Sequence, residues 1–299
     1  MSMNSANPAA AIEFRNVYLS FDGVPALSDV SFRLESGEMI FLTGISGSGK
    51  SVLLSLAMGL LQPDSGKIWV EGREIENLDE SELLEMRSDL MGMVFQEDSL
   101  FSGLTVYENV AYRPEEHGWE PERIEKAVAE VLKFVGLEGE DSKLPEELSG
   151  GMKRRLEIAR ALIGWPKIML YDEPTMSLDP IVAIQVLDLV IRARDVNKIS
   201  SLYVTKKIHE LPHLASLIAT QNESGNITIT EAPIDQAPKT KVIVLERGRI
   251  AFVGSVEEFK RSDLRAIKEL IALDSHDHSK DPYFNDPWDK RRHPREKLL

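Results

Sequence analysis

The chain has 299 residues, of which 42% are apolar and 28% charged, so it can bury the core of one large α/β domain or two modest ones. Its formal net charge of −14 argues against a dedicated nucleic-acid binder, because such proteins usually present a basic face. The absence of cysteine excludes disulfides, thiolate metal sites and cysteine nucleophiles, and it agrees with a cytoplasmic location.

The first predicted elements are strands. Residues 1–11 are small and polar, without the basic start and apolar run of a signal peptide, and we expect a disordered lead-in. Residues 12–17 and 30–34 alternate apolar and polar side chains, which is typical of half-buried strands. The Phe-Asp-Gly sequence at 21–23 predicts a turn between them.

A glycine-rich turn then joins an apolar strand, 39–42, to an apolar helix that runs to about residue 61. The residues of this turn and of the helix start are Gly44, Ile45, Ser46, Gly47, Ser48, Gly49, Lys50 and Ser51. They fit the phosphate-loop pattern G-x-x-x-x-G-K-[ST], in which backbone N–H groups converge on phosphate oxygens at the positive end of a helix. Lys50 would reach the β- and γ-phosphates, and the Ser51 hydroxyl would hold Mg²⁺. The sequence therefore predicts a nucleotide site.

Helical and strand patterns alternate through the middle of the chain. Residues 97–165 are mostly helical, and 121–135 has the apolar spacing of an amphipathic helix. Short apolar runs predict buried strands at 91–95, 168–171 and 201–204. Further helices are predicted at 81–90, 181–193 and 208–218.

The last quarter of the chain combines polar and hairpin patterns. Residues 219–240 are polar and contain two prolines, so we expect an inserted loop or hairpin. Residues 241–253 predict a hairpin that turns at Arg-Gly. One helix is expected over 256–273, and 274–299 lack periodicity and predict a disordered tail.

Four short motifs follow the phosphate loop in an order that is more informative than any one of them. They are Gln96 at a strand end, Leu148-Ser149-Gly150-Gly151 at a helix start, Asp172-Glu173 at a strand end, and Ser177-Leu178-Asp179. In these motifs, and above all in the Ser-Gly-Gly signature, residues 12 to about 259 resemble the ATPase subunits of ABC transporters. The resemblance implies an α/β fold with a P-loop NTPase core of the ABC ATPase type. It also implies an antiparallel β subdomain near the N-terminus, a helical subdomain over about 97–165, and a C-terminal helix and tail over 260–299.

The resemblance further implies how one subunit would handle ATP and Mg²⁺. Asp172 would hold Mg²⁺ through water, together with Ser51. Glu173 would act as general base toward the attacking water. Gln96 would contact both Mg²⁺ and this water, and it would report the nucleotide state to the helical subdomain.

The same resemblance implies a homodimer with ATP sandwiched between the subunits. Asp179 would lie on the dimer seam, and Phe21 would stack on adenine, with Tyr18 as a nearby rival. The residues that would approach the γ-phosphate bound by the opposite subunit are Ser149, Gly150 and Gly151. Their small size and backbone N–H groups suit close contact at a helix N-terminus.

One position departs from the family. A histidine usually follows the strand that corresponds to 201–204 and contacts the γ-phosphate, whereas this chain has Lys206 followed by Lys207. Lysine would neutralise phosphate charge, but it lacks the proton chemistry of imidazole near neutral pH. His209 is a candidate stand-in that falls on the next predicted helix. We expect ATP binding to survive and hydrolysis to be slow or differently organised.

Two stretches resemble the ATPases of Mla/Mce-associated lipid transport. The signature continues with Met152 where glutamine is common, and residues 93–101 and 105–112 are similar to the corresponding stretch of those proteins. The resemblance implies phospholipid or other lipid transport through an integral membrane permease, at the cytoplasmic side of the inner membrane. A periplasmic lipid-binding protein and an accessory regulatory protein would be further partners. The departures are Lys206, the stretch 175–177, the insertion and the tail.

Three alternatives remain open from the sequence. The ATPase of a small-solute importer, for example for amino acids, shares every catalytic motif and differs in its partner permease. Soluble ABC proteins of DNA repair or translation usually carry two cassettes or a long coiled-coil insertion, and this chain has neither. A regulatory module without turnover is favoured only by Lys206, while Glu173 and the complete signature argue against it.

Overall fold

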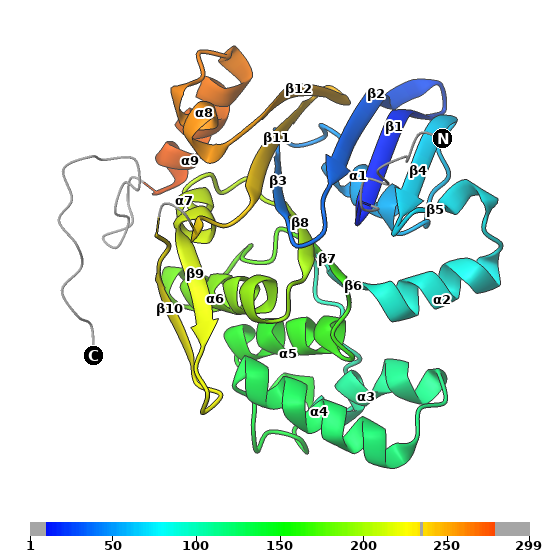
Figure 1. Cartoon of the computed structure of the whole chain (residues 1–299), viewed down its shortest axis with the longest axis vertical. Coiled ribbons are helices and arrows are strands. Elements are labelled where there is room, and N and C mark those ends of the chain that lie inside the picture. The colour runs from blue at the N-terminus through cyan, green and yellow to red at the C-terminus, as the bar shows by residue number, and fades with distance from the viewer. Residues whose placement is uncertain (1–9, 234–235, 279–299) are drawn as a thin grey trace, which may run out of the picture.

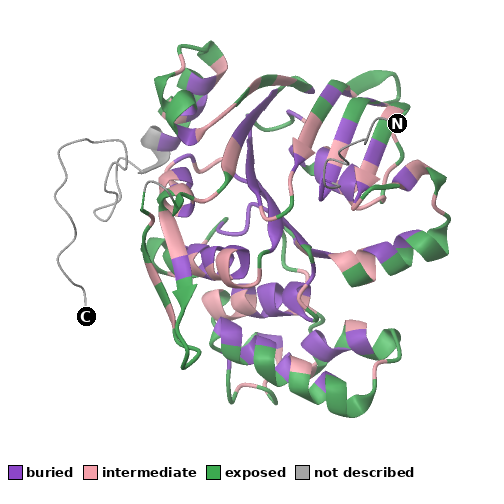
Figure 2. Cartoon of the chain, in the orientation of Figure 1, coloured by how far each residue is buried: buried purple, intermediate pink, exposed green. Residues whose placement is uncertain are grey.

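The computed structural model describes residues 10–233 and 236–278, and a six-stranded sheet lies at its centre (Figure 1). The strand order is β12-β11-β3-β8-β7-β6, with β3 Met39–Thr43, β6 Met91–Val94, β7 Ile168–Asp172, β8 Ser200–Val204, β11 Thr240–Glu246 and β12 Arg249–Gly254. The strands from β11 to β6 are parallel, and β12 is antiparallel at the edge. Every residue of β3, β7 and β8 is buried, as expected for parallel strands that are covered on both faces (Figure 2).

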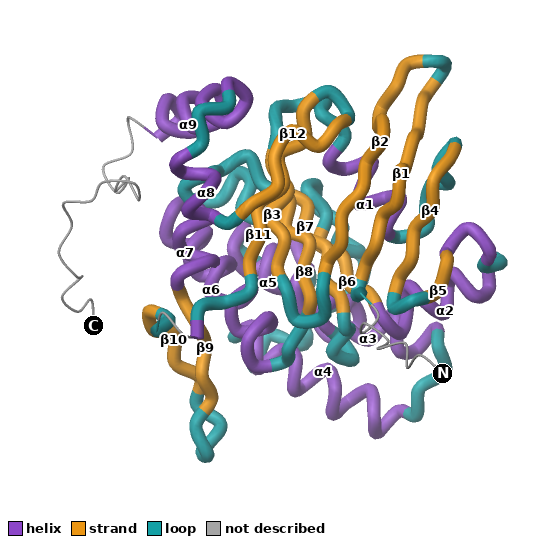
Figure 3. Tube along the Cα trace, turned by 45° about the horizontal axis from the view of Figure 1, so that its top comes forward, coloured by secondary structure: helices purple, strands orange, loops and turns teal. Residues whose placement is uncertain are grey.

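An antiparallel sheet lies beside the central one, as Figure 3 shows, and confirms the predicted β subdomain. Its order is β2-β1-β4-β5, with β1 Ile12–Phe21, β2 Val24–Leu34, β4 Ser65–Val70 and β5 Arg73–Glu74. Both predicted strands extend further toward the turn than their alternation indicated. Ala11, which we assigned to the lead-in, is fully buried and accepts a hydrogen bond from the Glu71 N–H at 3.0 Å. Residues 1–9 lie outside the described residues.

Helices cover the central sheet and form a separate layer below it (Figure 1). Their bounds are α1 Lys50–Ala57, α2 Glu80–Leu90, α3 Val106–Glu116, α4 Pro121–Val135, α5 Gly150–Leu162, α6 Pro180–Val196 and α7 Glu210–Ser216, with 3₁₀ turns at Ile75–Asn77 and Pro145–Glu147. The amphipathic helix predicted at 121–135 is α4, which begins with proline and ends at Gly136 in the left-handed conformation, φ 70°. Helices α3, α4 and α5 pack on one another and make up the helical subdomain.

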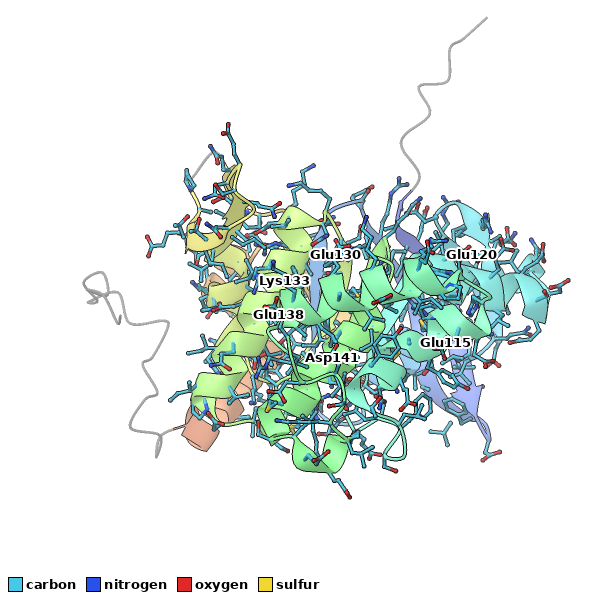
Figure 4. The ribbon with its side chains drawn as sticks, turned by 90° about the horizontal axis from the view of Figure 1, so that it is seen from below. Glu115, Glu120, Glu130, Lys133, Glu138 and Asp141 are labelled. Carbon is cyan, nitrogen blue, oxygen red and sulfur yellow. The ribbon has the colours of Figure 1, made fainter. Side chains whose placement is uncertain are left out.

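The outer face of this helical layer is acidic. Figure 4 shows it from below, with Glu115, Glu120, Glu130, Glu138 and Asp141 spread across it and Lys133 among them. All six side chains belong to exposed residues. These acidic side chains therefore lie on the face away from the sheet.

The polar insertion contains a hairpin of β9 Leu217–Gln221 and β10 Ile227–Glu231. Arg194 and Asp195 of α6 hold it, because Arg194 Nη2 donates to the Leu217 carbonyl at 2.7 Å and Asp195 Oδ2 accepts from the Ala219 N–H at 2.8 Å. The helix predicted at 208–218 ends earlier, at Ser216, since Leu217 already belongs to β9.

The helix predicted at 256–273 is two helices, α8 Val256–Arg261 and α9 Arg265–His278. The break lies at Ser262, which has extended backbone and whose hydroxyl accepts a hydrogen bond from the Leu264 N–H at 3.3 Å. Residues 279–299, most of the predicted tail, lie outside the described residues. Within the described part of the chain, none of the helices combines the length and apolar character needed to span a bilayer.

Candidate nucleotide and magnesium site

The phosphate loop lies between β3 and α1 and closes tightly on itself. Gly47 and Gly49 have φ values of 75° and 104°, a region that favours glycine. A β-carbon at Gly44 would lie 2.2 Å from the Leu245 carbonyl oxygen, and one at Gly49 would lie 2.9 Å from the Ala26 carbonyl oxygen. Gly44 and Gly49, predicted for phosphate binding, are therefore also required by packing against β11 and β2, whereas Gly47 is required only by its backbone conformation.

Lys50 is only 6% exposed, and its ammonium lies over the loop. Nζ donates to the carbonyl oxygens of Gly44 at 2.7 Å and Ile45 at 2.9 Å. Burial, followed by the charge of Lys206, lowers the pKa of Lys50 to about 8. A desolvated cation beside a glycine-rich helix N-terminus is suited to bind phosphate oxygens.

Ser51 and Asp172 come together from different elements, the start of α1 and the end of β7. The Ser51 hydroxyl hydrogen-bonds to the Asp172 carboxylate, while burial raises the pKa of this carboxyl group. A hydroxyl and a carboxylate are oxygen ligands of the kind that Mg²⁺ takes, along with phosphate oxygens and water. Among the described residues, no group of three or more His, Asp or Glu side chains could hold a metal by itself. This pair therefore fits an ion that is bound together with a nucleotide.

Glu173 follows directly, in a left-handed backbone conformation with φ 47°. Its N–H donates to the Val204 carbonyl of β8 at 3.0 Å, and its side chain is buried. Lys206 Nζ lies 2.6 Å from Glu173 Oε1. The residue at the expected switch position thus forms an ion pair with the expected general base. His209 lies elsewhere, with Nδ1 2.9 Å from Asp274 Oδ1 of α9.

Gln96 lies two residues beyond β6 and not at its last residue, and its side chain is exposed. A buried arginine fixes its backbone: Arg154 Nη2 donates to the Gln96 carbonyl at 3.2 Å and Nη1 to the Phe95 carbonyl at 2.8 Å. The same Nη1 lies 2.6 Å from the Glu157 carboxylate. The basic run at 153–155 is typical of a solvated helix side, but Arg154 is buried because the Gln96 segment folds over the helix.

The signature and Asp179 lie at two neighbouring helix starts. The Ser149 hydroxyl caps α5 by accepting from the Met152 N–H at 3.3 Å, and the Asp179 carboxylate caps α6 by accepting from the Ile181 and Val182 N–H groups at 3.1 and 3.0 Å. A β-carbon at Gly151 would lie 2.6 Å from Val182 Cγ1, so α5 and α6 meet closely there.

Ser149, Gly150 and Asp179 are exposed. In the described residues no hydrogen bond joins them to the phosphate loop of the same chain. The fold thus does not bring them into this nucleotide site, and their contact with a partner's nucleotide stays a prediction.

Phe21 and Tyr18 are both half-exposed, at 47% and 40%. Phe21 is the last residue of β1, opposite Val24 at the start of β2. The next residues of β2 reach the phosphate loop, as the close approach of Ala26 to Gly49 shows. Phe21 is therefore the better candidate to stack on adenine, because the strand that follows it, β2, reaches the phosphate loop. Tyr18 instead pairs with Ser65 of β4.

The chain is similar to known proteins in sequence and in fold. A family model described as "ABC transporter" matches residues 27–176. The methionine import ATP-binding protein MetN of Carboxydothermus hydrogenoformans is 39% identical over 225 residues, which cover 73% of this chain and 66% of that protein. The glycine betaine/carnitine transport ATP-binding protein GbuA of Listeria monocytogenes is 39% identical over 69% of this chain and 52% of its own length. The chain thus spans about half to two thirds of the length of these two relatives.

A chloroplastic protein of Arabidopsis thaliana named TRIGALACTOSYLDIACYLGLYCEROL 3 is 36% identical over 84% of this chain and 70% of its own length. A dimeric structure of a bacterial ABC transporter cassette superposes with a TM-score of 0.68 at 27% identity, covering 82% of this chain and 98% of the cassette. A post-hydrolysis dimer of that cassette, bound to ADP and Pi, superposes with a TM-score of 0.66. The fold predicted from the motifs is confirmed.

Proposed function

Because this chain belongs to the ABC transporter family of ATP-binding proteins, we propose that it is the ATPase subunit of a membrane transporter. The observation that supports this proposal most strongly is that three parallel strands end at one site. The phosphate loop follows β3, Asp172 and Glu173 end β7, and Lys206 follows β8, so binding and hydrolytic groups meet at the carboxyl edge of the sheet.

Each side chain has a chemical task in this proposal. Lys50 and the loop N–H groups bind the β- and γ-phosphates, and Ser51 and Asp172 hold Mg²⁺, which would neutralise charge on the phosphates. Glu173 orients the attacking water and accepts its proton. Lys206 holds this carboxylate at 2.6 Å, and the ion pair must loosen before the carboxylate takes a proton. For that reason we expect hydrolysis to be slow.

Turnover of purified protein tests this assignment. Wild type should hydrolyse ATP only with Mg²⁺, and Glu173→Gln should lower kcat by about a hundredfold to a thousandfold while nucleotide affinity is retained. Lys206→His should raise kcat, because imidazole would not hold the carboxylate as a permanent ion pair. An unchanged rate in Lys206→His would show that this position does not limit turnover.

A groove between the core and the helical subdomain supports the assignment to a transporter. Its volume is about 330 Å³, and α2, β6, α3 and α5 contribute to its lining. The large apolar side chains that are half-exposed in it are Leu84, Phe95, Phe101 and Tyr112. Contiguous exposed apolar side chains of this kind mark interaction sites. We assign the groove to a cytoplasmic segment of a partner permease, which would place the chain at the cytoplasmic face of the membrane.

A small solute is the cargo class that the relatives favour. Methionine import proteins recur among them, including those of Leifsonia xyli and Clostridioides difficile, and the specific likeness to Mla/Mce phospholipid ATPases has no such support. Lipid transport stays as the second candidate, because one relative is named for trigalactosyldiacylglycerol. The proposal is therefore an importer ATPase for an amino acid or similar solute.

Affinity capture of the tagged chain from gently solubilised membranes distinguishes a small-solute importer from a lipid transporter. A permease that co-purifies with a small-solute-binding protein supports the importer, whereas a lipid-binding protein with enriched phospholipid supports lipid transport. Leu84→Asp should lose the permease and keep nucleotide binding, since Leu84 lines the groove and not the phosphate loop. Wild-type capture without any membrane protein would overturn the transporter assignment.

A further inference from the structure

One fully formed polar cluster lies beneath the site without touching the groups assigned to catalysis. Glu210, the first residue of α7, is only 2% exposed. Its Oε1 accepts a hydrogen bond from the Thr175 hydroxyl, and its Oε2 accepts from the Tyr203 hydroxyl at 2.9 Å and the Thr205 hydroxyl at 3.0 Å. All three donors are buried as well.

The three donors belong to the two segments that carry Glu173 and Lys206. Thr175 lies two residues after Glu173, and Thr205 directly precedes Lys206. Lys207 adds a second tie, because its Nζ donates to the Thr175 carbonyl at 2.8 Å and its N–H to the Thr205 hydroxyl at 2.9 Å. One carboxylate therefore links both sides of the ion pair between Glu173 and Lys206.

The loop that Thr175 anchors is conformationally strained. Glu173 and Ser177 both have left-handed backbones, with φ values of 47° and 61°. Such conformations cost non-glycine residues on the order of 1 kcal/mol or more each, and they persist where surrounding contacts fix them. Thr175 lies midway between the two, so its hydrogen bonds to Glu210 and Lys207 are placed to fix them.

The chemistry of the cluster fits an ionised carboxylate. Three hydroxyls can all donate to Glu210 only if both of its oxygens act as acceptors. Burial and the neighbouring carboxylate raise the pKa of Tyr203 well above its usual value, so its hydroxyl stays a donor. A buried charge that is fully hydrogen-bonded adds little stability over apolar packing, but it fixes geometry.

We propose that Glu210 is a positioning residue for ATP hydrolysis, which holds the Glu173 loop and the Lys206 segment in one fixed relation. It acts through Thr175, Tyr203 and Thr205, and it is not itself a catalytic residue. The inference rests on the proposed role of Glu173 toward water. A displacement of about 1 Å at a reacting group can cost a hundredfold in rate, so loss of this clamp reaches the chemistry.

Glu210→Gln keeps the shape and replaces one acceptor oxygen by a donor. We expect kcat to fall about tenfold to a hundredfold, while ATP affinity, measured by titration with a fluorescent nucleotide, changes by less than about twofold. Thr175→Val removes one donor to Glu210 and should lower kcat in the same way. The double variant should lose little more than either single one, because both break the same link.

The matched control is Asp195→Asn, which alters a partly buried carboxylate that is also hydrogen-bonded, at the hairpin and away from the site. Asp195 accepts from the Ala219 N–H and from Arg194, so the variant should lose stability while kcat of the folded protein is unchanged. If Glu210→Gln leaves kcat unchanged, or lowers it only as far as Asp195→Asn does at equal folded fraction, Glu210 is purely structural and the proposal is overturned.

Failure of the proposed function gives a different result. Wild type that binds ATP without hydrolysing it would overturn the ATPase assignment, and amide hydrogen exchange then decides the role of Glu210. Faster exchange over residues 173–177 in Glu210→Gln, but not in Asp195→Asn, would support the clamp. Unchanged exchange there would refute it.

Discussion

Buried Lys50 lies at the carboxyl edge of the sheet near a second, partly exposed cation, Lys206, and near the buried carboxylates of Asp172 and Glu173. Burial lowers the pKa of Lys50 most, Lys206 lowers it further, and the two carboxylates oppose both effects, leaving it at about 8. The phosphates of a nucleotide would favour the ammonium form, because they bring negative charge to Nζ. We therefore expect Lys50 to couple nucleotide binding to proton uptake.

Nucleotide affinity should fall as the pH rises through the pKa of Lys50. Below about pH 8 the free protein already carries the ammonium, and above it the proton must be taken up on binding. We expect the Kd for Mg-ATP to rise about fivefold to tenfold between about pH 7 and about pH 9. Isothermal titration calorimetry in buffers of different ionisation enthalpy should detect proton uptake that is largest at the upper end.

Lys50→Ala is the control for this coupling. It should bind more weakly at every pH and lose the proton uptake, since the titrating group has been removed. Uptake that persists in Lys50→Ala, or a Kd of wild type that is flat over this range, would contradict the assignment to Lys50.

The signature helix α5 is joined to the Gln96 segment by Arg154, whose planar group serves two carbonyls and one carboxylate. Lysine has a single nitrogen and cannot serve all three together. Arg154→Lys should therefore lower the free energy of unfolding by about 1–3 kcal/mol, because Glu157 and two carbonyls lose donors in a buried place. Urea unfolding followed by circular dichroism would measure it.

Lys153 is the matched control, one residue away and not buried. Lys153→Ala should change the free energy of unfolding by no more than about 0.5 kcal/mol. If the two substitutions change the free energy of unfolding equally, the hydrogen bonds of Arg154 contribute no more than the contacts of Lys153. The link between α5 and the Gln96 segment would then not stabilise the fold.

Elements with strong local signals could be predicted from the sequence. Helix α4 has the spacing, the first-turn proline and the terminal glycine of a helix at its observed bounds, and β3 is a continuous apolar run before glycine. The break between α8 and α9 could not be predicted from periodicity, because it depends on the local hydrogen bond of Ser262. The β9–β10 hairpin was left as loop or hairpin, since its support comes from Arg194 and Asp195 of a different element.

The same distinction holds within the site. The phosphate loop was predictable because its residues are consecutive, so local pattern and function coincide. The contact of Lys206 with Glu173, and the burial of Arg154 and Glu210, depend on strand order and on which loop covers which helix. Such contacts between distant segments produce no periodic pattern in the sequence. The expected chemistry therefore indicated which residue types the site needs, but not which residues contact one another.

The whole molecule combines a strongly acidic surface with two exposed helix starts at the signature and Asp179. Each chain carries a formal net charge of −14, so two copies repel one another at long range. Part of the acidic surface lies on the outer face of the helical layer (Figure 4). If two copies meet through nucleotide, bound Mg-ATP and the N–H groups at Ser149 and Gly150 must outweigh this repulsion. A structural neighbour of this fold has been solved as a dimer.

The last prediction follows from that balance and concerns the predicted homodimer. Glu173→Gln should form a dimer with Mg-ATP and stay monomeric with Mg-ADP, because the γ-phosphate is the group that the opposite signature would bind. Moderate salt should favour the dimer, since it screens the repulsion between the two acidic chains over roughly 10 Å.

Ser149→Arg should prevent dimer formation by inserting a bulky side chain at the signature. Ser142→Arg, the same change at an exposed site seven residues earlier, should not. Sedimentation velocity would report the oligomeric state under each of these conditions. A monomer under every condition, or a dimer that Ser149→Arg leaves intact, would place the ATP contact somewhere other than the α5 start.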